Sequence, residues 1–431
     1  MVLGLAACGG GSGTHTSGLS NRAFVSDDFD GTLHIENAAR DMEPGFTIAT
    51  GSKPGTMVLS RDKSITLVFD SGDESLAVVS NSSESVLGRI TLPNICPATP
   101  PTPCMSYVSM SDNTVGFVAV PNCPPGSCSG NTNIVNVVDV VDLKTTFNVT
   151  GTINKDSATG QPLNATTTLV LSPTGNKLLV FGSPGEHVDT MVVIDTTTAK
   201  TTPGMAATQL GAADCVKASL PKNCFDRPVS AVFSTDGNTA YVFNCGPECQ
   251  GMTASVTVLN VAGTSPAPTN YIPFPATAAA TVGLLSGSTL FVAGTPSGTP
   301  GTLAGQLSVL DTTKLATPAS SVPISDGYHN HMELASNNKL FIGAIICSAG
   351  CLTIFDTSAN KATVDSNTGD VTGIAPITGR NVVYVVENLV AGSFLGLGEL
   401  RIYDTTASVP TVTPTQIDVV GRAVDVKYVD Q

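Results

Sequence analysis

"TTTLVLSPTGNKLLVFGSPGEHVDTMVVIDTTTAK" at Thr166–Lys200 has the same internal plan as "RPVSAVFSTDGNTAYVFNCGPECQGMTASVTVLNVAG" at Arg227–Gly263. Each stretch has an apolar run, a Ser-x-x-Gly-Asn turn, a second run, a variable loop, and a third run that ends in Asp or Asn. A weaker fourth run follows, such as Asn270–Ala276 after the second stretch. Short runs rich in Val, Leu, Ile and Phe between turn residues are typical of β-strands. No long stretch has helical periodicity, so the pattern predicts an all-β chain.

The unit recurs along most of the chain, and its first strand is expected near residues 56–60, 105–110, 167–172, 229–234, 280–285, 331–335, 371–376 and 422–429. Successive starts lie roughly 40–60 residues apart, the period of four-stranded β-propeller blades. At the ends, Arg22–Ala38 supplies second and third strands without a first, and Gly421–Asp430 supplies a first strand alone. Joining them in one blade closes the ring and leaves no open sheet edge. The sequence therefore predicts a β-propeller of eight four-stranded blades, or of seven if residues 279–324 are irregular.

The strand ends carry a further signal. Second strands read AYVFN at Ala240–Asn244, YVVEN at Tyr384–Asn388 and AFVSD at Ala23–Asp27. Third strands end in VVIDT, SVLDT, TIFDT and RIYDT at Val192–Thr196, Ser308–Thr312, Thr353–Thr357 and Arg401–Thr405. With these motifs the chain resembles the YVTN family of β-propeller repeats over nearly its whole length after about residue 20. The resemblance implies the fold but not the function, because that family includes surface proteins, binding modules and relatives of lactonases.

Residues 1–20 are expected to lie outside the propeller domain, which we place at residues 21–431. Leu5–Cys8 resembles a bacterial lipobox, and the Gly/Ser-rich stretch after Cys8 is typical of a flexible tether. This predicts lipidation of Cys8, and Gly9 after it favours an outer-membrane or surface location over the inner membrane. Only seven residues precede Cys8, so either the start codon lies upstream or the match is accidental and this stretch is a disordered tail.

Cysteine spacing indicates an exported protein. Of eleven cysteines, ten beside Cys8 form five close pairs, and disulfides are the default for such pairs in an oxidising compartment. No histidine has the spacing expected of a zinc site, and a C-x-x-C redox motif is absent. In a propeller all five pairs map to one face, where they would stiffen a recognition surface. The predicted disulfides are Cys96–Cys104, Cys123–Cys128, Cys215–Cys224, Cys245–Cys249 and Cys347–Cys351.

Two clusters of polar residues are candidate sites. Equivalent positions at the starts of the first strands hold Lys53, Arg227, His329, Asp370 and Arg422. They predict an anionic ligand at the mouth of the central channel; the alternative is that strand starts near a water-filled channel accept any polar residue. The second cluster is His329, His331 and Glu333, whose spacing predicts one shared face and a divalent metal site. The alternative is a set of channel-lining side chains satisfied by water or backbone. The stretch SDDFDGTLHIEN at Ser26–Asn37 lacks the Glu of an EF-hand and favours a plain hairpin turn at Asp30-Gly31.

The composition narrows the function. The net charge of −14 argues against nucleic acid and anionic membrane surfaces as partners. No nucleophile elbow or phosphate-binding glycine loop is present. We therefore expect a lipid-anchored, non-catalytic binding or scaffolding module of the bacterial cell envelope, with a protein, peptide or small anionic partner and no required cofactor beyond a possible divalent metal. The alternative is a lactonase-like or metal-dependent enzyme that uses the channel mouth, with His329, His331, Glu333 and Arg227 as its residues.

Overall fold

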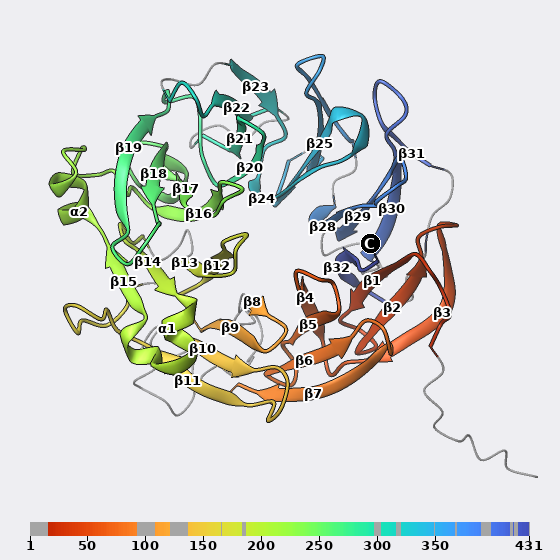
Figure 1. Cartoon of the computed structure of the whole chain (residues 1–431). Coiled ribbons are helices and arrows are strands. Elements are labelled where there is room, and N and C mark those ends of the chain that lie inside the picture. The colour runs from red at the N-terminus through yellow and green to blue at the C-terminus, as the bar shows by residue number, and fades with distance from the viewer. Residues whose placement is uncertain are drawn as a thin grey trace, which may run out of the picture.

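The computed structural model is a ring of eight four-stranded antiparallel sheets, as Figure 1 shows. It describes residues 16–92, 108–120, 137–164, 166–182, 187–296, 303–315, 320–348, 350–366, 369–388, 398–413, 417 and 421–430. The prediction of an eight-bladed propeller is confirmed. Residues 279–324, the unit that left seven blades open, contain a complete blade.

We number the blades from the one that joins the chain ends, and give the strands of each from the centre outwards. Blades 1 and 2 contain β32 (Ala423–Tyr428), β1 (Arg22–Asp27), β2 (Thr32–Asn37) and β3 (Met42–Ala49), then β4 (Pro54–Leu59), β5 (Ile65–Asp70), β6 (Ser75–Ser80) and β7 (Ser85–Thr91). Blades 3 and 4 contain β8 (Val108–Asp112), β9 (Val115–Val120), β10 (Val137–Asp142) and β11 (Val149–Ile153), then β12 (Thr168–Leu171), β13 (Lys177–Phe181), β14 (Met191–Asp195) and β15 (Ala207–Leu210).

Blades 5 and 6 contain β16 (Pro228–Phe233), β17 (Thr239–Asn244), β18 (Ser255–Asn260) and β19 (Ala267–Pro273), then β20 (Val282–Ser286), β21 (Thr289–Gly294), β22 (Gly305–Asp311) and β23 (Ser320–Ile324). Blades 7 and 8 contain β24 (Tyr328–Leu334), β25 (Lys339–Ile345), β26 (Leu352–Asp356) and β27 (Lys361–Val364), then β28 (Asp370–Pro376), β29 (Val382–Asn388), β30 (Gly398–Asp404) and β31 (Thr411–Val412). The helical turns are α1 (Thr196–Thr201), α2 (Ala212–Lys217), η2 (Pro203–Met205), η3 (Gly246–Cys249) and η4 (Ser336–Asn338).

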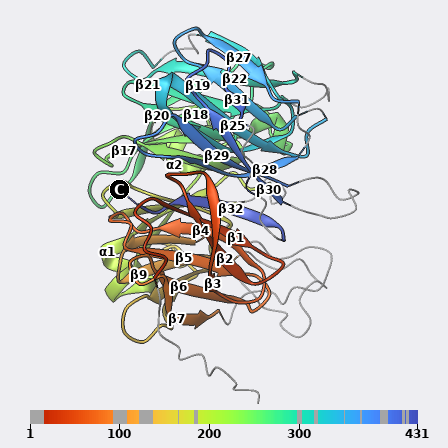
Figure 2. The same cartoon turned by 90° about the vertical axis from the view of Figure 1, so that its right-hand side faces the viewer.

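The chain ends close the ring as predicted. The last strand, β32, pairs antiparallel with β1, with Val426 opposite Val25, and Figure 2 shows β32 beside the N-terminal strands. Just outside this pair, Arg22 Nη2 lies 2.5 Å from Asp430 Oδ1. Because β32 is the first strand of blade 1 and β1 the second, β32 ends on the same face of the ring where β1 begins.

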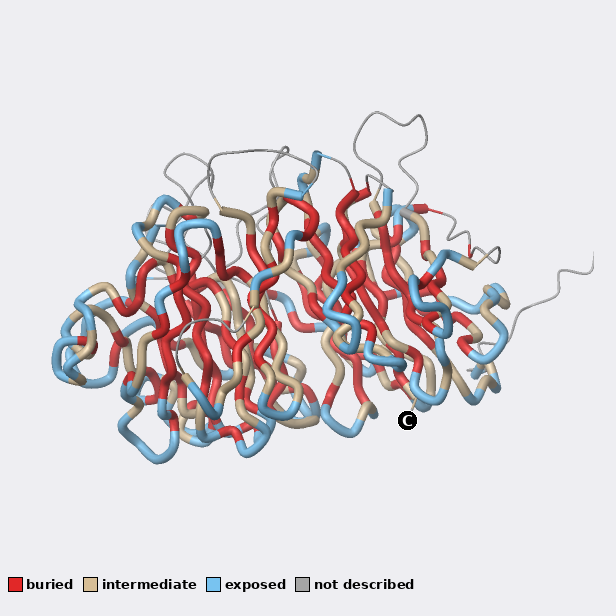
Figure 3. Tube along the Cα trace, turned by 90° about the horizontal axis from the view of Figure 1, so that it is seen from above, coloured by how far each residue is buried: buried red, intermediate tan, exposed pale blue. Residues whose placement is uncertain are grey.

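The core lies between the blades. The described residues form eight large apolar clusters, and each joins one pair of neighbouring blades. The second and third strands are the most buried, and Figure 3 shows the buried segments in red through the thickness of the ring. A blade buried on both faces has nearly continuous apolar runs, which is why the strands could be recognised in the sequence. No helix among the described residues has the length and apolar character needed to cross a membrane.

The strand directions give the ring two different faces. The loops between second and third strands, and the connections between blades, lie on one face, which we call the cysteine face. Disulfides Cys215–Cys224, Cys245–Cys249 and Cys347–Cys351 are present there, with Cα–Cα distances of 5.8, 5.6 and 5.5 Å. Cys8 and the predicted pairs Cys96–Cys104 and Cys123–Cys128 lie outside the described residues.

The opposite face carries the loops between first and second strands and those between third and fourth strands. Asp311, Asp356 and Asp404 each accept a backbone hydrogen bond from the residue two positions later, at 2.8–2.9 Å. These bonds hold the turn after each strand and explain why a short polar residue recurs there. The pair Arg22–Asp430, and with it both ends of the described chain, lies on this face.

Candidate functional site

The residues predicted at the channel mouth stand at the starts of the first strands. Lys53, Arg227 and Arg422 directly precede β4, β16 and β32. Arg227 Nη1 lies 2.7 Å from Asp189 Oδ1, and Arg422 Nε donates to Asp28 Oδ1 at 2.8 Å. Both guanidinium groups therefore already pair with carboxylates, whereas the Lys53 side chain is exposed.

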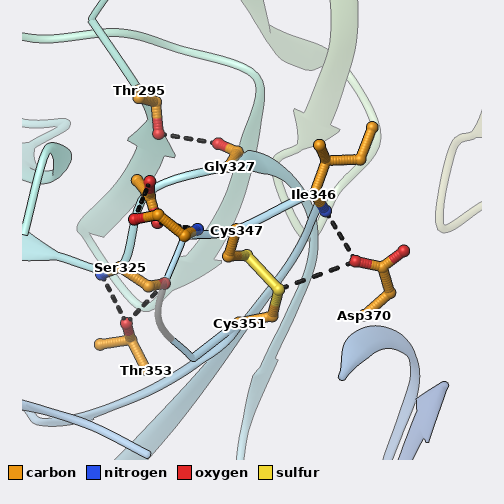
Figure 4. The surroundings of a disulfide bond; sticks show 10 residues. Thr295, Ser325, Gly327, Ile346, Cys347, Cys351, Thr353 and Asp370 are labelled. Carbon is orange, nitrogen blue, oxygen red and sulfur yellow. Dashed lines mark hydrogen bonds between the residues drawn. A yellow bond between two sulfur atoms is a disulfide. The ribbon is translucent and has the colours of Figure 1, made fainter. Parts of the chain in front are cut away.

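Asp370, the first residue of β28, orders a loop of the neighbouring blade. Its Oδ1 accepts a hydrogen bond from the backbone N–H of Ile346 at 2.7 Å, as Figure 4 shows. Ile346 is in the loop between β25 and β26 and directly precedes the disulfide cysteine Cys347. The carboxylate of Asp370 thus fixes one side of this disulfide-closed loop.

The structure does not bring His329, His331 and Glu333 together on one face. A β-bulge between His329 and His331 pairs them with Ala344 and Gly343, neighbours on β25 that point to opposite faces. His329 is fully buried near Gly305 of blade 6, and burial lowers its pKa to about 4. His331 and Glu333 instead lie on the side of blade 7 that faces blade 8. Gly343, the β25 residue opposite His331, packs on that side against Val371 of β28.

The cysteine face carries exposed apolar side chains. Those with more than half of their surface exposed on this face are Phe29 (82%), Met252 (80%), Ile346 (80%), Val216 (60%) and Leu303 (55%), which we call the apolar set. Three of them adjoin disulfides: Val216 follows Cys215, Ile346 precedes Cys347, and Met252 lies three residues after Cys249. On the opposite face, Met205 alone among the described large apolar residues is more than half exposed, so the strongly exposed apolar side chains favour the cysteine face.

Aspartates fix the backbone beneath the three most exposed members of the apolar set. The N–H of Phe29 donates to Asp27 Oδ1 at 2.8 Å, and that of Met252 to Asp226 Oδ2 at 2.8 Å. The bond from Ile346 to Asp370 repeats the arrangement. Ile346 also has a φ of 59°, a left-handed conformation that costs a β-branched residue about 1–3 kcal/mol. The surrounding bonds therefore hold Ile346 in a conformation that it would not adopt alone.

Hydrogen bonds link the loops of blades 4 to 7 along the cysteine face. His187 Nδ1 lies 3.2 Å from the carbonyl oxygen of Cys249. The backbone N–H of Thr295 donates to Glu248 Oε2 at 2.9 Å, and its hydroxyl donates to the Gly327 carbonyl at 2.7 Å. Burial raises the pKa of Glu248 to about 8. These links make the loops of four blades one connected surface.

A second polar cluster lies in blade 1 and was not recognised from the sequence. His34 Nε2 lies 3.5 Å from Asp27 Oδ2 and 3.4 Å from Asp30 Oδ2, and His34 Nδ1 lies 2.8 Å from Glu43 Oε1. Asp30-Gly31 does form a hairpin turn, as predicted. The overlooked signal was a histidine three residues after Gly31, on a strand that pairs with the one ending at Asp27.

The electrostatics of this cluster are unusual. Burial acts to lower the pKa of His34, but the carboxylates of Asp27, Glu43 and Asp30 outweigh it and raise that pKa to about 9. Burial, with the charge of Glu43, raises the pKa of Glu36 to about 8. Neither oxygen of Glu36 has a hydrogen-bond partner among the described residues. A group of buried polar atoms without partners is rare in folded proteins and requires an explanation.

Comparisons with known proteins identify the fold. No protein-family model and no curated protein matches the sequence. Among solved structures, the chain is similar to the dihydro-heme d1 dehydrogenase NirN in complex with DHE, with a TM-score of 0.58, 13% identity, and coverage of 91% of this chain and 72% of that chain. It is also similar to apo AztD from Citrobacter koseri, with a TM-score of 0.51, 12% identity, and coverage of 95% and 97%. At these identities the likeness shows the propeller fold alone.

Proposed function

We propose that this chain is an exported binding protein whose cysteine face holds a protein or peptide partner through an apolar patch of that partner. The observation that carries the proposal is the combination found at Met252 and Ile346. Each side chain is 80% exposed, each adjoins a disulfide, and each has its backbone N–H fixed by an aspartate.

The energetics of binding favour a role for the exposed apolar side chains in partner recognition. Covering apolar surface contributes roughly 25 cal/mol for each Å² removed from water. Much of that gain is normally offset by the ordering of mobile loops when a complex forms. Loops that are already fixed by disulfides and aspartates avoid most of this ordering cost. An apolar side chain on such a loop therefore contributes more to affinity than the same side chain on a mobile loop.

The paired arginines favour a protein or peptide over a small anion. Arg227 and Arg422 lie on the same face, but their guanidinium groups already bond Asp189 and Asp28. An anionic ligand would have to displace these carboxylates before it used the same N–H donors. A polypeptide partner needs no such exchange, because it would contact the apolar side chains directly.

The disulfides support an oxidising compartment as the place of action, because disulfides persist there and are rare in reducing cytosol. We further propose attachment to the outer membrane or cell surface through a lipid on Cys8. The lipobox-like Leu5–Cys8 and the Gly/Ser-rich stretch after it support this attachment. Radiolabelled fatty-acid incorporation that is lost in Cys8→Ser tests it.

Site-specific photo-crosslinking in intact cells tests the proposed binding face. A photoreactive amino acid replaces Met252, and a matched chain carries it at Met205, which is 70% exposed but lies between β14 and β15 on the opposite face. We expect a discrete adduct from position 252 and none from 205. The partner identified from the adduct is then purified and its affinity measured. It should bind the double variant Met252→Ser/Ile346→Ser at least tenfold more weakly than the unchanged chain, and Met205→Ser as tightly as the unchanged chain. Equal adducts from both faces, or unchanged affinity of the double variant, would overturn the proposal.

A further inference from the structure

In the blade 1 cluster, two buried side-chain atoms without a hydrogen-bond partner among the described residues converge with a third, partly exposed carboxylate oxygen. His34 and Asp27 are 3% and 0% exposed. His34 Nε2 and Asp27 Oδ2 have no hydrogen-bond partner among the described residues. Asp30 Oδ2 completes the group, and the three atoms lie within 4.8 Å of one another.

The companion atoms of the same three side chains are all held. Asp27 Oδ1 accepts from the backbone N–H groups of Phe29 and Arg422 at 2.8 and 3.0 Å. Asp30 Oδ1 accepts from the hydroxyl and the N–H of Thr32 at 2.6 and 3.1 Å. On the other side of the imidazole, His34 Nδ1 bonds Glu43. Each side chain is therefore oriented by one atom while its other atom points into the cluster.

This arrangement has the form of a metal site with its outer shell in place. A histidine that binds a metal through one ring nitrogen usually bonds a carboxylate or carbonyl through the other, as His34 bonds Glu43. Two ligands about 2.1 Å from a tetrahedral zinc ion lie roughly 3.4 Å apart. The separations of 3.5 and 3.4 Å from His34 Nε2 to the aspartate oxygens match this value. They are too long for good hydrogen bonds.

We propose that Asp27, Asp30 and His34 bind one divalent transition-metal ion, with zinc as the first ion to test. The imidazole nitrogen favours transition metals over calcium and magnesium, which prefer oxygen ligands alone. Asp30 has 37% of its side chain exposed, so the ion can enter from solvent. The same opening leaves a coordination position for water or a donor from a partner.

The other side of the imidazole fits an ion less well. His34, Glu36 and Glu43 form a second convergent group. The distance of 2.8 Å between His34 Nδ1 and Glu43 Oε1 is that of a hydrogen bond and is short for two ligands of one tetrahedral ion. We therefore place the ion at Nε2, with Glu43 as a positioning residue.

The test compares two aspartates of the same turn. Asp30→Asn removes a proposed ligand, whereas Asp28→Asn removes an equal charge from a residue that pairs with Arg422. Both variants and the unchanged chain are stripped with a chelator, and Zn²⁺ binding is measured by calorimetry and by metal analysis after dialysis. We expect about one ion per unchanged chain, a tenfold or greater loss of affinity in Asp30→Asn, and little change in Asp28→Asn.

Cobalt provides a readout of the histidine. Co²⁺ bound to the unchanged chain should give visible absorption bands that shift or disappear in His34→Gln, with circular dichroism as the check that this buried variant folds. Asp30→Asn, at an exposed position, serves the same purpose if His34→Gln does not fold. Absence of stoichiometric binding, equal losses in Asp28→Asn and Asp30→Asn, or dependence on Glu36 but not on Asp30 would overturn the proposal.

Discussion

Asp226 Oδ2 accepts a hydrogen bond from the backbone N–H of Met252 at 2.8 Å. Asp226 lies in the connection between blades 4 and 5, and Met252 lies in the loop between β17 and β18. The same oxygen accepts from Thr253 N–H at 2.7 Å. One carboxylate from a blade connection therefore orders the tip of a disulfide-closed loop and its exposed side chain.

We predict that Asp226→Ala loosens this loop without unfolding the propeller. Two partly buried N–H groups lose their acceptor, and a hydrogen bond to a charged group contributes about 1.5–3 kcal/mol. Hydrogen exchange should show faster exchange of the Met252 and Thr253 amides. Asp236→Ala, which removes a carboxylate from the turn after β16, is the control and should leave those amides unchanged. Equal protection in both variants would contradict the assigned role of Asp226.

Loss of the Cys245–Cys249 disulfide should also act locally. A disulfide that closes so short a loop contributes about 2–3 kcal/mol in the chain-entropy model. The eight inter-blade clusters do not depend on it. Cys245→Ser/Cys249→Ser should keep its far-UV circular dichroism at 25 °C, yet proteases should cleave it near residues 245–252. Global unfolding at that temperature would show that the disulfide supports the whole fold.

Glu248 should make stability fall as the pH rises. Its pKa in the folded chain is about 8, above the ordinary value of 4.5. Between these values the folded state binds more protons than the unfolded state, so its stability is complete below about pH 4.5 and is lost as the pH rises through 8. Glu248→Gln keeps an acceptor for Thr295 and removes the charge. It should be more stable than the unchanged chain at pH 9, by on the order of a few kcal/mol. The two should be equal near pH 4. Urea unfolding at both pH values measures this, and parallel pH profiles would disprove it.

The ion pair Arg22–Asp430 should stabilise ring closure. Both side chains are largely buried, at 12% and 15% exposure. Arg22→Ala removes a charged pair with several hydrogen bonds and should lower the free energy of unfolding by about 1.5–3 kcal/mol. Arg40→Ala, at an exposed position, should change it by less than about 0.5 kcal/mol. Chemical denaturation measures the two variants, and similar values would refute a special role for the closing pair.

Local patterns were sufficient to predict the architecture. The strands within Thr166–Lys200 and Arg227–Gly263 could be recognised from short runs of consecutive residues. The incomplete blade at each end of the chain could be recognised in the same way. The bulge at Asn330 could not be predicted, because alternation along β24 does not reveal one inserted residue. It alone sends His329 and His331 to opposite faces.

The contacts of the candidate site residues could not be predicted from the sequence, because their partners are distant along the chain. Arg422 was placed correctly at a strand start, but its carboxylate partner Asp28 is 394 residues away. The cluster around His34 is assembled from β1, the following turn, β2 and β3, so no single stretch contains its geometry. The spacing of residues along one strand carries no information about which atoms of another strand remain without partners.

The position of Arg22 beside Asp430 also determines from which side of the ring the protein can be attached to a surface. Both ends of the described chain lie on the side away from the disulfides, and the C mark is at the lower edge of the ring in Figure 3. If the proposed lipid on Cys8 anchors the chain, the tether joins the ring on the side away from Met252 and Ile346. A fluorescent protein or surface linker attached at either end would likewise leave those side chains accessible.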